Sequence, residues 1–441
     1  MKETILQFGT GNFLRGFFDY FIDDMNKRGL YDGKIIIVSP TNSKTVDKIN
    51  RQNGRYNLIL RGLENNTEVN RRTEIHSVTR AVNPYADFDE FISLADNPDL
   101  RFIVSNTTEA GICFDDTCRI DDKPASSFPA KLTQFLYARY RNKLGGFVIL
   151  SCELIDNNGK ELRNCVLKYA RLWNSDEKFV KWIETENIFC NTLVDRIVTG
   201  YPSEEAEKIF TEIGYRDELL DTAEPYHLWV IEGNFENELP LRKAGFNVVW
   251  ADDVSPYKKM KVRILNGSHT SLVFPSLLCG VETVGESLKN NLLNEYLNCC
   301  LYKYILPVLG GKEEETLFAN AVLERFANPY IRHLWKSISL NSVSKFAARV
   351  LPTIVDYYKT ENDLPKPLVF SFACLIEYYK TNRVCDDAEK AEYIRENNIT
   401  DILSNENLWG RSLSFLEKTV KECTEKIHTN GITEAIKWSM L

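Results

Sequence analysis

One stretch near the middle of the chain brings together three residue types that can do acid–base chemistry. It reads Lys261, Val262, Arg263, Ile264, Leu265, Asn266, Gly267, Ser268 and His269. If the stretch is helical, a rotation of about 100° per residue sets Asn266 roughly 140° and His269 roughly 80° around from Lys261. The spacing therefore predicts that Lys261, Asn266 and His269 share one side of a helix.

These three side chains could interconvert an alcohol and a carbonyl. A lysine whose charge is destabilised by burial loses its proton near neutral pH and can then act as general base on an alcohol. Asn266 could donate a hydrogen bond to the developing oxyanion, and His269 could orient the lysine or the substrate. The alternative is structural: a surface lysine, a capping asparagine and a core histidine. We expect no metal, because no metal-ligand spacing links His76, His227, His269, His333 and His428.

A glycine-rich turn follows the first apolar run of the chain and predicts a dinucleotide site. The run ETILQF leads into Gly9 and Gly11, which would allow a tight turn and a close approach of the backbone to a pyrophosphate. The third glycine of the dinucleotide fingerprint is missing, because Leu14 stands in its place, so a turn without a ligand stays open. The predicted cofactor contacts here are Phe8, Gly9, Thr10, Gly11, Asn12, Phe13 and Leu14.

Two further strand ends bear on the cofactor. The run IIIV leads into Ser39, Pro40, Thr41 and Asn42, without the acidic residue that usually bonds the adenosine ribose, so NAD and NADP are not separated; NAD (NADH) is expected. Lys44 could favour a phosphate or be a solvated loop residue. Another strand end carries a polar cluster, Ser105 to Glu109, for which cofactor contacts and a simple loop cap are the two interpretations. The predicted contacts are Asn106, Thr107 and Thr108.

The pattern of the whole chain predicts an α/β protein. Apolar runs in the first half alternate with amphipathic stretches, the rhythm of a parallel sheet, whereas the chain reads helical from about residue 255. With 441 residues, two domains are expected. We predict a Rossmann-like doubly wound domain over 1–254 and a mostly α-helical substrate-binding domain over 255–441.

Composition narrows the class of protein. The net charge of -8 opposes binding to nucleic acid or to an anionic membrane surface. The amino-terminal stretch leaves no room for a signal peptide, and the apolar runs are too short to span a bilayer. The eleven cysteines are scattered without a CxxC pair, which favours reduced thiols in the cytoplasm.

Four stretches together resemble the mannitol dehydrogenase family, the polyol-specific long-chain dehydrogenases. The pattern KxxxxNxxH is similar to its catalytic motif, and FGTGNFLRGF is similar to its cofactor loop. NTLVDRIV resembles its signature segment, and ERFANPYIRH through NSVSKFAARVLPTI resembles the substrate-facing part of its helical domain. The resemblance spans nearly the whole chain and implies metal-free hydride transfer with Lys261 as acid and base. It also implies that Asp195 and Arg196 serve the substrate site.

One departure from the family pattern points to a sugar-acid branch other than the enzymes that act on mannitol or fructuronate. Family members that act on mannitol or on fructuronate carry SCDN at a strand end, where the asparagine is one of two oxyanion donors. Here the stretch reads Ser151, Cys152, Glu153 and Leu154. Leu154 cannot donate that bond. Glu153 could position substrate hydroxyls or relay protons, or could be a structural carboxylate.

A sugar-acid substrate needs a cation for its carboxylate. Lys345 and Arg349 are the candidates, because residues four apart share one helix face. The expected partner is this small molecule, and the expected assembly is a monomer or homodimer. There are two rival interpretations. One is an enzyme of the same family that acts on fructuronate and mannonate or on a neutral polyol such as mannitol, and the other is a dinucleotide-binding sensor without turnover.

Overall fold

The computed structural model describes residues 1–382 and 384–441. The chain divides into two compact units. Unit 1 comprises residues 1–62 and 68–255, and unit 2 comprises residues 63–67 and 256–441. Unit 2 therefore includes a short piece from early in the chain, which the sequence did not indicate.

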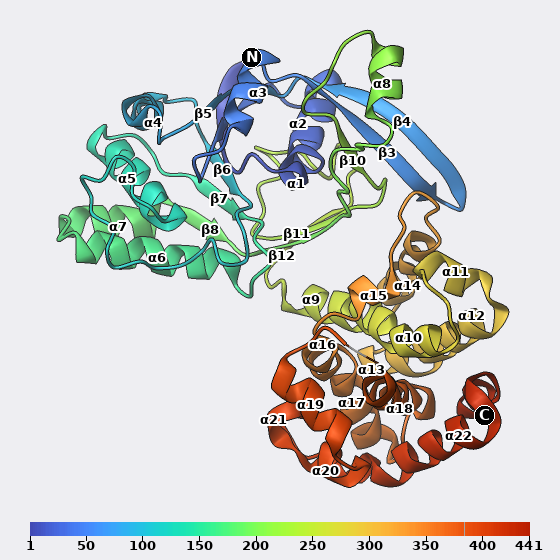
Figure 1. The fold of residues 1–441 in the computed structure, drawn as a ribbon. Helices are drawn as coiled ribbons and strands as arrows, with labels where there is room; N and C mark the ends of the chain where they lie inside the picture. Colours follow the sequence, from blue (N-terminus) through green and yellow to red (C-terminus); the bar gives the residue numbers. More distant parts are fainter. Residues whose placement is uncertain (383) are drawn as a thin grey trace. The chain divides into compact units, whose positions relative to one another are not determined.

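A six-stranded parallel sheet forms the centre of unit 1 (Figure 1). Its order is β5-β2-β1-β6-β7-β8. The strand order reverses between β1 and β6, because β2 and β5 follow on one side of β1 and β7 and β8 on the other side of β6. Ligands of such sheets bind outside the carboxyl ends of the strands at this reversal point. The strands are β1 (Lys2–Phe8), β2 (Gly33–Val38), β5 (Val78–Val82), β6 (Phe102–Ser105), β7 (Val148–Ser151) and β8 (Ile188–Cys190).

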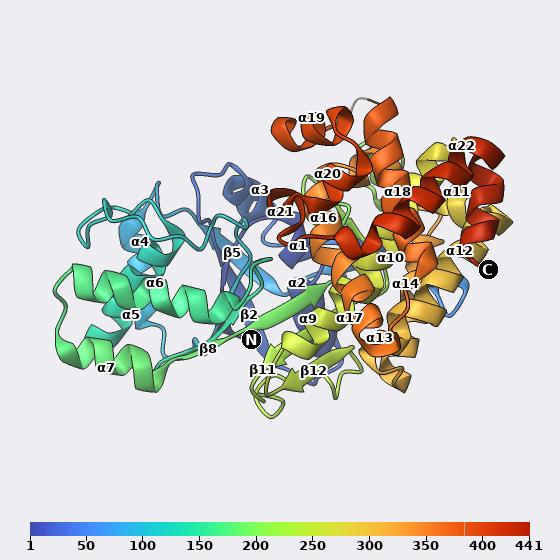
Figure 2. The ribbon, with the colours of Figure 1, turned by 90° about the horizontal axis from the view of Figure 1, so that it is seen from below.

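Helices cover both faces of this sheet. The hydrophobic core on one face contains residues of the first three helices, and the core on the other face contains residues of the next four. The first set is α1 (Asn12–Arg15), α2 (Phe18–Lys27) and α3 (Thr45–Arg51). The second set is α4 (Phe88–Ser93), α5 (Phe128–Arg141), α6 (Asn158–Leu172) and α7 (Glu177–Glu186), of which α5, α6 and α7 lie together in Figure 2.

The first strand shows why this sheet is buried on both sides. Ile5 belongs to the core on the face of α1 to α3, whereas Leu6 and Phe8 belong to the core on the opposite face. Side chains alternate between the faces of a strand, so a continuous apolar run is what a strand covered on both sides requires. The predicted doubly wound fold is confirmed.

Two small sheets, which lie in unit 1 except for the tip of one hairpin at residues 63–67, were not predicted. One has the order β10-β3-β4 and the other β12-β11-β9. The strands β3 and β4 meet at Asn65 and Asn66, which both have positive φ, as a tight hairpin turn requires. This pair of asparagines between two strand-like runs is a sequence signal from which the hairpin could have been predicted. The strands are β3 (Tyr56–Glu64), β4 (Thr67–Ile75), β9 (Thr192–Asp195), β10 (Asp221–Ala223), β11 (Leu228–Glu232) and β12 (Val248–Ala251); α8 (Ala206–Ile213) precedes β10.

Unit 2 is built from helices, as the sequence predicted. Its first part contains α9 (Ser255–Lys261), a π-helix (Val262–Asn266), α10 (Gly267–Leu278), α11 (Val284–Lys289), α12 (Asn291–Asn298), a second π-helix (Cys299–Ile305), α13 (Leu306–Leu309) and α14 (Glu313–Phe326). Its second part contains α15 (Trp335–Ile338), α16 (Ser342–Arg349), α17 (Leu351–Glu361), α18 (Lys366–Thr381), α19 (Ala388–Glu396), α20 (Ile399–Ser404), α21 (Glu406–Trp409) and α22 (Glu417–Ser439). Among the described residues, no helix is long and apolar enough to cross a membrane.

The central sheet provides a test of the fold. Ile103 on β6 is fully buried between β1 and β7. Ile103→Ala should destabilise unit 1 by about 2–5 kcal/mol, because a large-to-small change in a core leaves a cavity. Calorimetry should show the midpoint of the unit 1 transition lowered by about 5–15 °C. Leu172→Ala, at a 41% exposed position, is the control and should shift the midpoint little; equal shifts for both variants would contradict this core.

Candidate active site

The glycine turn lies at the reversal point of the sheet. Phe8 at the end of β1 pairs with Ser105 at the end of β6, so the two following loops begin side by side. Gly9 has φ +139°, and a Cβ there would lie 2.9 Å from the backbone oxygen of Asn106. No atom lies within 4 Å of a Cβ added at Gly11. Gly9 is therefore needed for the contact between the loops, while Gly11 leaves open space beside the backbone.

The missing third glycine has a structural explanation. Leu14 is buried in the core of unit 1, whereas a Cβ at Gly16 would lie 2.9 Å from a methyl group of Val198. The close packing that the third glycine provides in the fingerprint is thus provided two residues later. The chain breaks its helix here, since α1 has only four residues and α2 begins at Phe18. A ligand anion would therefore depend on the backbone N–H groups of the turn rather than on a long helix dipole.

The second predicted cofactor segment is held by the predicted substrate residue Glu153. The carboxylate of Glu153 accepts hydrogen bonds from the Ser105 hydroxyl, the Thr107 hydroxyl and the Thr107 backbone N–H, each at 3.1 Å. Asn106 donates from Nδ2 to the Cys152 oxygen at 2.6 Å. Burial raises the pKa of Glu153, and these hydrogen bonds oppose that rise. The geometry is that of the structural carboxylate, the alternative that the sequence left open; contact with substrate stays a prediction.

Thr108 and Leu154, which follow the two strand ends just described, are not part of this hydrogen-bond network. Thr108 is exposed in the loop after β6, and Leu154 is 62% exposed. The Leu154 side chain has no polar group, so it cannot replace the oxyanion donor of the family pattern.

Asp195 and Arg196 lie at the end of β9 and are both buried. Arg196 donates from Nε to the Glu224 backbone oxygen at 2.9 Å and lies over the ring of Tyr20. Its two terminal nitrogens have no hydrogen-bond partner in the part of the chain that the structure describes. Burial lowers the pKa of Arg196 to about 10, so its guanidinium keeps its charge at neutral pH. The structure thus holds an unsatisfied cation in the signature segment.

In unit 2 the stretch from Lys261 to His269, called the reaction stretch below, contains a π-helix that the sequence did not predict. Lys261 ends α9, Asn266 ends the π-helix and His269 lies in the first turn of α10. A π-helix has i→i+5 hydrogen bonds, so residue i+5 comes to lie above residue i. Lys261 and Asn266 are five apart, and the angle of roughly 140° expected for an α-helix is therefore too large. The π-helix brings the two side chains closer to one face.

Arg263 links the π-helix to α17 through two side-chain hydrogen bonds. Arg263 donates to the Thr353 hydroxyl at 2.8 Å and to an Asp356 carboxylate oxygen at 2.8 Å. Both partners belong to α17. This partly buried ion pair, together with the Thr353 bond, holds the π-helix against α17.

His269 occupies an aromatic environment. Its ring stacks on Phe326 at 4.3 Å between centroids and meets Trp335 and His333 edge-on at 5.6 and 6.0 Å. Burial lowers the pKa of His269 to about 3, with His333 and nearby cations adding to the effect. The imidazole is therefore neutral at physiological pH. Its Nε2 is buried and has no hydrogen-bond partner among the described residues.

The cations that act on His269 include both predicted carboxylate ligands. They are Arg349, Arg325 and Lys345. Lys345 and Arg349 lie on α16, and a Cβ at Gly267 would lie 3.0 Å from the Arg349 backbone oxygen, so α10 and α16 touch beside the reaction stretch. Lys345 donates from Nζ to the Ile338 oxygen at 2.8 Å. The structure thus brings the end of α16 next to Asn266 and His269.

Arg325 was missed by the sequence analysis. It lies in the last turn of α14, is buried, and lowers the pKa values of both His269 and His333. It lies in the stretch ERFANPYIRH that was recognised as similar to the family, but nothing in its spacing distinguished it from an exposed helix arginine. Among the described residues, no group of three or more His, Cys, Asp or Glu side chains is arranged to hold a metal ion.

Comparison with known proteins covers both units. Residues 3–243 match the mannitol dehydrogenase Rossmann domain, and residues 253–430 match the mannitol dehydrogenase C-terminal domain. The chain is 40% identical to the altronate oxidoreductase of Bacillus subtilis, with 99% of this chain and 95% of that protein aligned. It is 41% identical to the altronate oxidoreductase of Pectobacterium atrosepticum, with 97% and 94% aligned.

Solved structures support the same fold. A substrate-free D-sorbitol dehydrogenase superposes with a TM-score of 0.88 at 23% identity, covering 99% of this chain and 95% of that one. The mannitol 2-dehydrogenase of Pseudomonas fluorescens, solved with NAD and D-mannitol, superposes with a TM-score of 0.72 at 22% identity, covering 99% and 94%. Since both domain matches together span almost all of the sequence, the chain belongs to the mannitol dehydrogenase family.

Proposed function

We propose that this chain, an oxidoreductase acting on CH–OH groups, interconverts D-tagaturonate and D-altronate with NAD(H). The observation that carries the proposal is the set of three cations, Arg325, Lys345 and Arg349, around the neutral His269. A neutral polyol has no use for such a field, whereas a sugar acid carries a carboxylate that needs it. The similarity to altronate oxidoreductases from several bacteria supports the same substrate.

The residues of unit 1 fit a nicotinamide dinucleotide. Open space beside Gly11 and the contact of Gly9 with Asn106 form a turn whose backbone a pyrophosphate can approach. Asn106 and Thr107 are held at the neighbouring strand end by Cys152 and Glu153, where ribose hydroxyls could be bound. When bound, NAD(H) accepts or supplies the hydride.

The residues of unit 2 handle the proton. In the oxidative direction neutral Lys261 accepts the proton of the substrate hydroxyl, and in reduction its ammonium form returns a proton to the nascent alkoxide. Asn266 donates a hydrogen bond to the substrate oxygen as negative charge develops. His269 stays neutral and positions the lysine or the substrate, since its buried Nε2 is still without a partner. In this proposal the proton chemistry rests on these residues and uses no metal.

Arg349 is the stronger of the two carboxylate candidates. Lys345 already donates to a backbone oxygen, which reduces what it can offer a ligand. A guanidinium can also bind a carboxylate through two parallel hydrogen bonds, which an ammonium cannot. We therefore assign the main carboxylate contact to Arg349 and a supporting charge to Lys345.

The proposal extends to the cellular compartment, the partner and the assembly of the protein. All eleven cysteines have free thiols, which supports a reducing compartment such as the cytoplasm. The proposed partner is the small-molecule sugar acid, without nucleic acid or membrane. The proposed assembly is a monomer or homodimer.

The substrate assignment can be tested by following NADH absorbance with purified protein. Rapid oxidation of NADH with D-tagaturonate, and slow oxidation with D-fructuronate and D-fructose, is the expected result. Preference for fructose would make the protein a neutral-polyol dehydrogenase. Binding of NADH without turnover on any of these substrates would instead favour a sensor.

Lys261→Ala should remove the proton-transfer group and leave the cofactor loop intact. We expect kcat to fall about 10²–10⁴-fold, the usual range for loss of a general acid or base. The dissociation constant for NADH, measured by fluorescence titration, should change less than about two-fold, since unit 1 holds the cofactor residues. Lys259→Ala, an exposed lysine of the same helix, is the matched control. Lost NADH binding with unchanged kcat would overturn this role of Lys261.

Arg349→Ala should separate charge recognition from chemistry. We expect kcat/KM for D-tagaturonate to fall about 10²-fold, the cost of one hydrogen-bonded ion pair. The slower reaction with D-fructose should change little, because that substrate has no carboxylate. Lys336→Ala, an exposed cation of α15, should leave both substrates unaffected. Unchanged activity of Arg349→Ala on the acid would remove Arg349 from the site.

A further inference from the structure

The carboxylate of Asp19, on α2, is fully buried next to the segment that carries the glycine turn and α1, residues 9–16. Three side chains act on this carboxylate and also make hydrogen bonds to groups of that segment. They are Gln7, Arg15 and Tyr56. Asp19 is therefore linked to the backbone that would approach a pyrophosphate.

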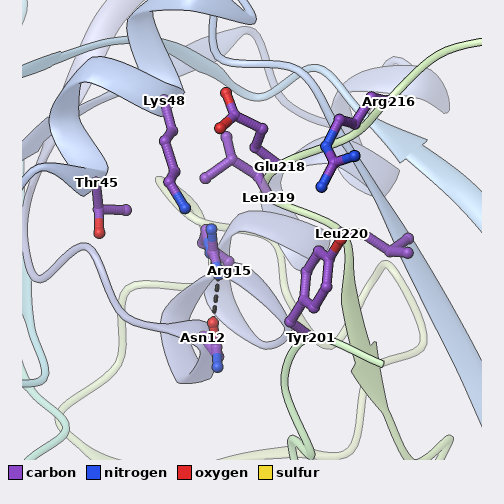
Figure 3. Close-up of a pocket in the computed structure, with 9 residues that line it drawn as sticks. All are labelled: Asn12, Arg15, Thr45, Lys48, Tyr201, Arg216, Glu218, Leu219 and Leu220. Atoms are coloured by element: carbon purple, nitrogen blue, oxygen red, sulfur yellow. Dashed lines mark hydrogen bonds between the residues drawn. The ribbon is translucent and has the colours of Figure 1, made fainter. Parts of the chain in front are cut away.

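Each of these side chains holds a different part of the segment. The Gln7 amide donates to the Gly9 oxygen at 3.2 Å. The Arg15 guanidinium donates to the Asn12 side-chain oxygen, as Figure 3 shows. The Tyr56 hydroxyl oxygen lies 2.9 Å from the backbone oxygen of Arg15. A change in the charge of the buried carboxylate is therefore transmitted to three points of the segment.

The Tyr56 hydroxyl lies between two acceptors. Its oxygen is 2.9 Å from the backbone oxygen of Arg15 and 3.1 Å from Oδ2 of Asp19. A phenol has one hydrogen, so it can donate to only one of these oxygens. An ionised Asp19 is the stronger acceptor and draws that hydrogen away from the segment. A protonated Asp19 donates its own O–H to the Tyr56 oxygen, and Tyr56 then donates to Arg15, so both contacts are hydrogen bonds.

The charges around Asp19 favour a proton on this carboxylate near neutral pH. Arg15 is the nearby cation, but its guanidinium also faces the buried Asp221 at 3.9 Å. Arg196 and Asp217 are further charged groups that act on Asp221. Arg15 also lines a cavity with other charged side chains, which are Lys48, Arg216 and Glu218. Burial raises the pKa values of Asp19 and Asp221 to about 7, and the charge of Asp221 adds to the rise for Asp19.

We propose that Asp19 is a positioning residue whose proton holds the glycine turn in its dinucleotide-binding arrangement, so that the cofactor binds with uptake of a proton. The proposal rests on the dinucleotide site proposed above. A pyrophosphate brings negative charge to the turn, and like charge nearby favours the protonated carboxylate. It also attracts Arg15, which withdraws from Asp19 part of the positive charge that stabilises its ionised form. Both effects raise the pKa of Asp19 on binding, so the affinity for the cofactor falls as the pH rises.

Proton uptake can be measured by titration calorimetry with NADH at pH 7, in phosphate and in Tris, two buffers that differ in their enthalpy of ionisation. We expect uptake of about 0.4 proton, the value for a pKa that rises on binding from about 7 to about 8. The dissociation constant of NADH, measured by fluorescence titration, should rise about ten-fold between about pH 6 and about pH 9, since one pKa unit corresponds to a factor of ten.

Asp19→Asn separates positioning by a proton from a merely structural role. The asparagine keeps the size of the side chain, and its amide can donate to Tyr56 as the protonated acid would. We expect this variant to bind NADH at the upper end of the pH range about as tightly as the unaltered protein does at the lower end, without proton uptake. A structural role would instead weaken binding equally at every pH. Asp23→Asn is the control, because Asp23 is a buried carboxylate of the same helix that Lys27 already pairs at 2.6 Å; both the uptake and the pH dependence should stay unchanged.

Asp221→Asn gives an independent measurement, which holds even if Asp19→Asn does not fold. It removes the carboxylate that competes for Arg15, so Asp19 should ionise more readily and the midpoint of the pH dependence should move to lower pH. An unchanged midpoint would overturn the proposal, as would proton uptake that persists in Asp19→Asn, since the proton would then bind elsewhere, for example at Glu153. NADH binding with constant affinity over this pH range and no proton uptake would overturn it and leave the proposed function intact. Failure of NADH to bind at any pH would remove the proposed cofactor role as well.

Discussion

Close approach of two backbones is the constraint on which the proposed functional residues of each unit depend. At Gly267 an added Cβ would lie 3.0 Å from the Arg349 oxygen, and at Gly9 it would lie 2.9 Å from the Asn106 oxygen. The first contact sets α16, with its cations, against the reaction stretch, and the second sets the glycine turn against the loop after β6. A side chain at either position would push apart the elements that carry the chemistry.

The environment of His269 shows how close packing lowers the pKa of a side chain. Phe326 and Trp335 pack against the imidazole, and burial is the main cause of its lowered pKa. Because the ring stays neutral, it adds no charge to a region that already contains Arg325 and Arg349. The positive charge of Arg349 can then act on the proposed anionic substrate, and a neutral ring nitrogen is available as a hydrogen-bond partner.

Much of this could be predicted from the sequence, because periodicity and turn residues act locally. The parallel sheet follows from its apolar runs, the glycine turn from Gly9 and Gly11, and the reaction stretch from Lys261, Asn266 and His269. The π-helix could not be predicted, since Val262–Asn266 has the composition of an ordinary helix. Nor could the roles of Gly16 and Glu153, because both depend on contacts with residues distant in the chain.

The protonation state of His269 is the most direct measure of the environment around the proposed catalytic residues. Histidine labelled with ¹⁵N, with His269→Gln to assign its signals, reports the charge of the ring by NMR between pH 5 and 8. The ring should remain neutral throughout that range, as its pKa of about 3 requires. Titration near the ordinary value of about 6.5 would show that the ring is exposed to water, and would contradict a desolvated, positively charged site in unit 2.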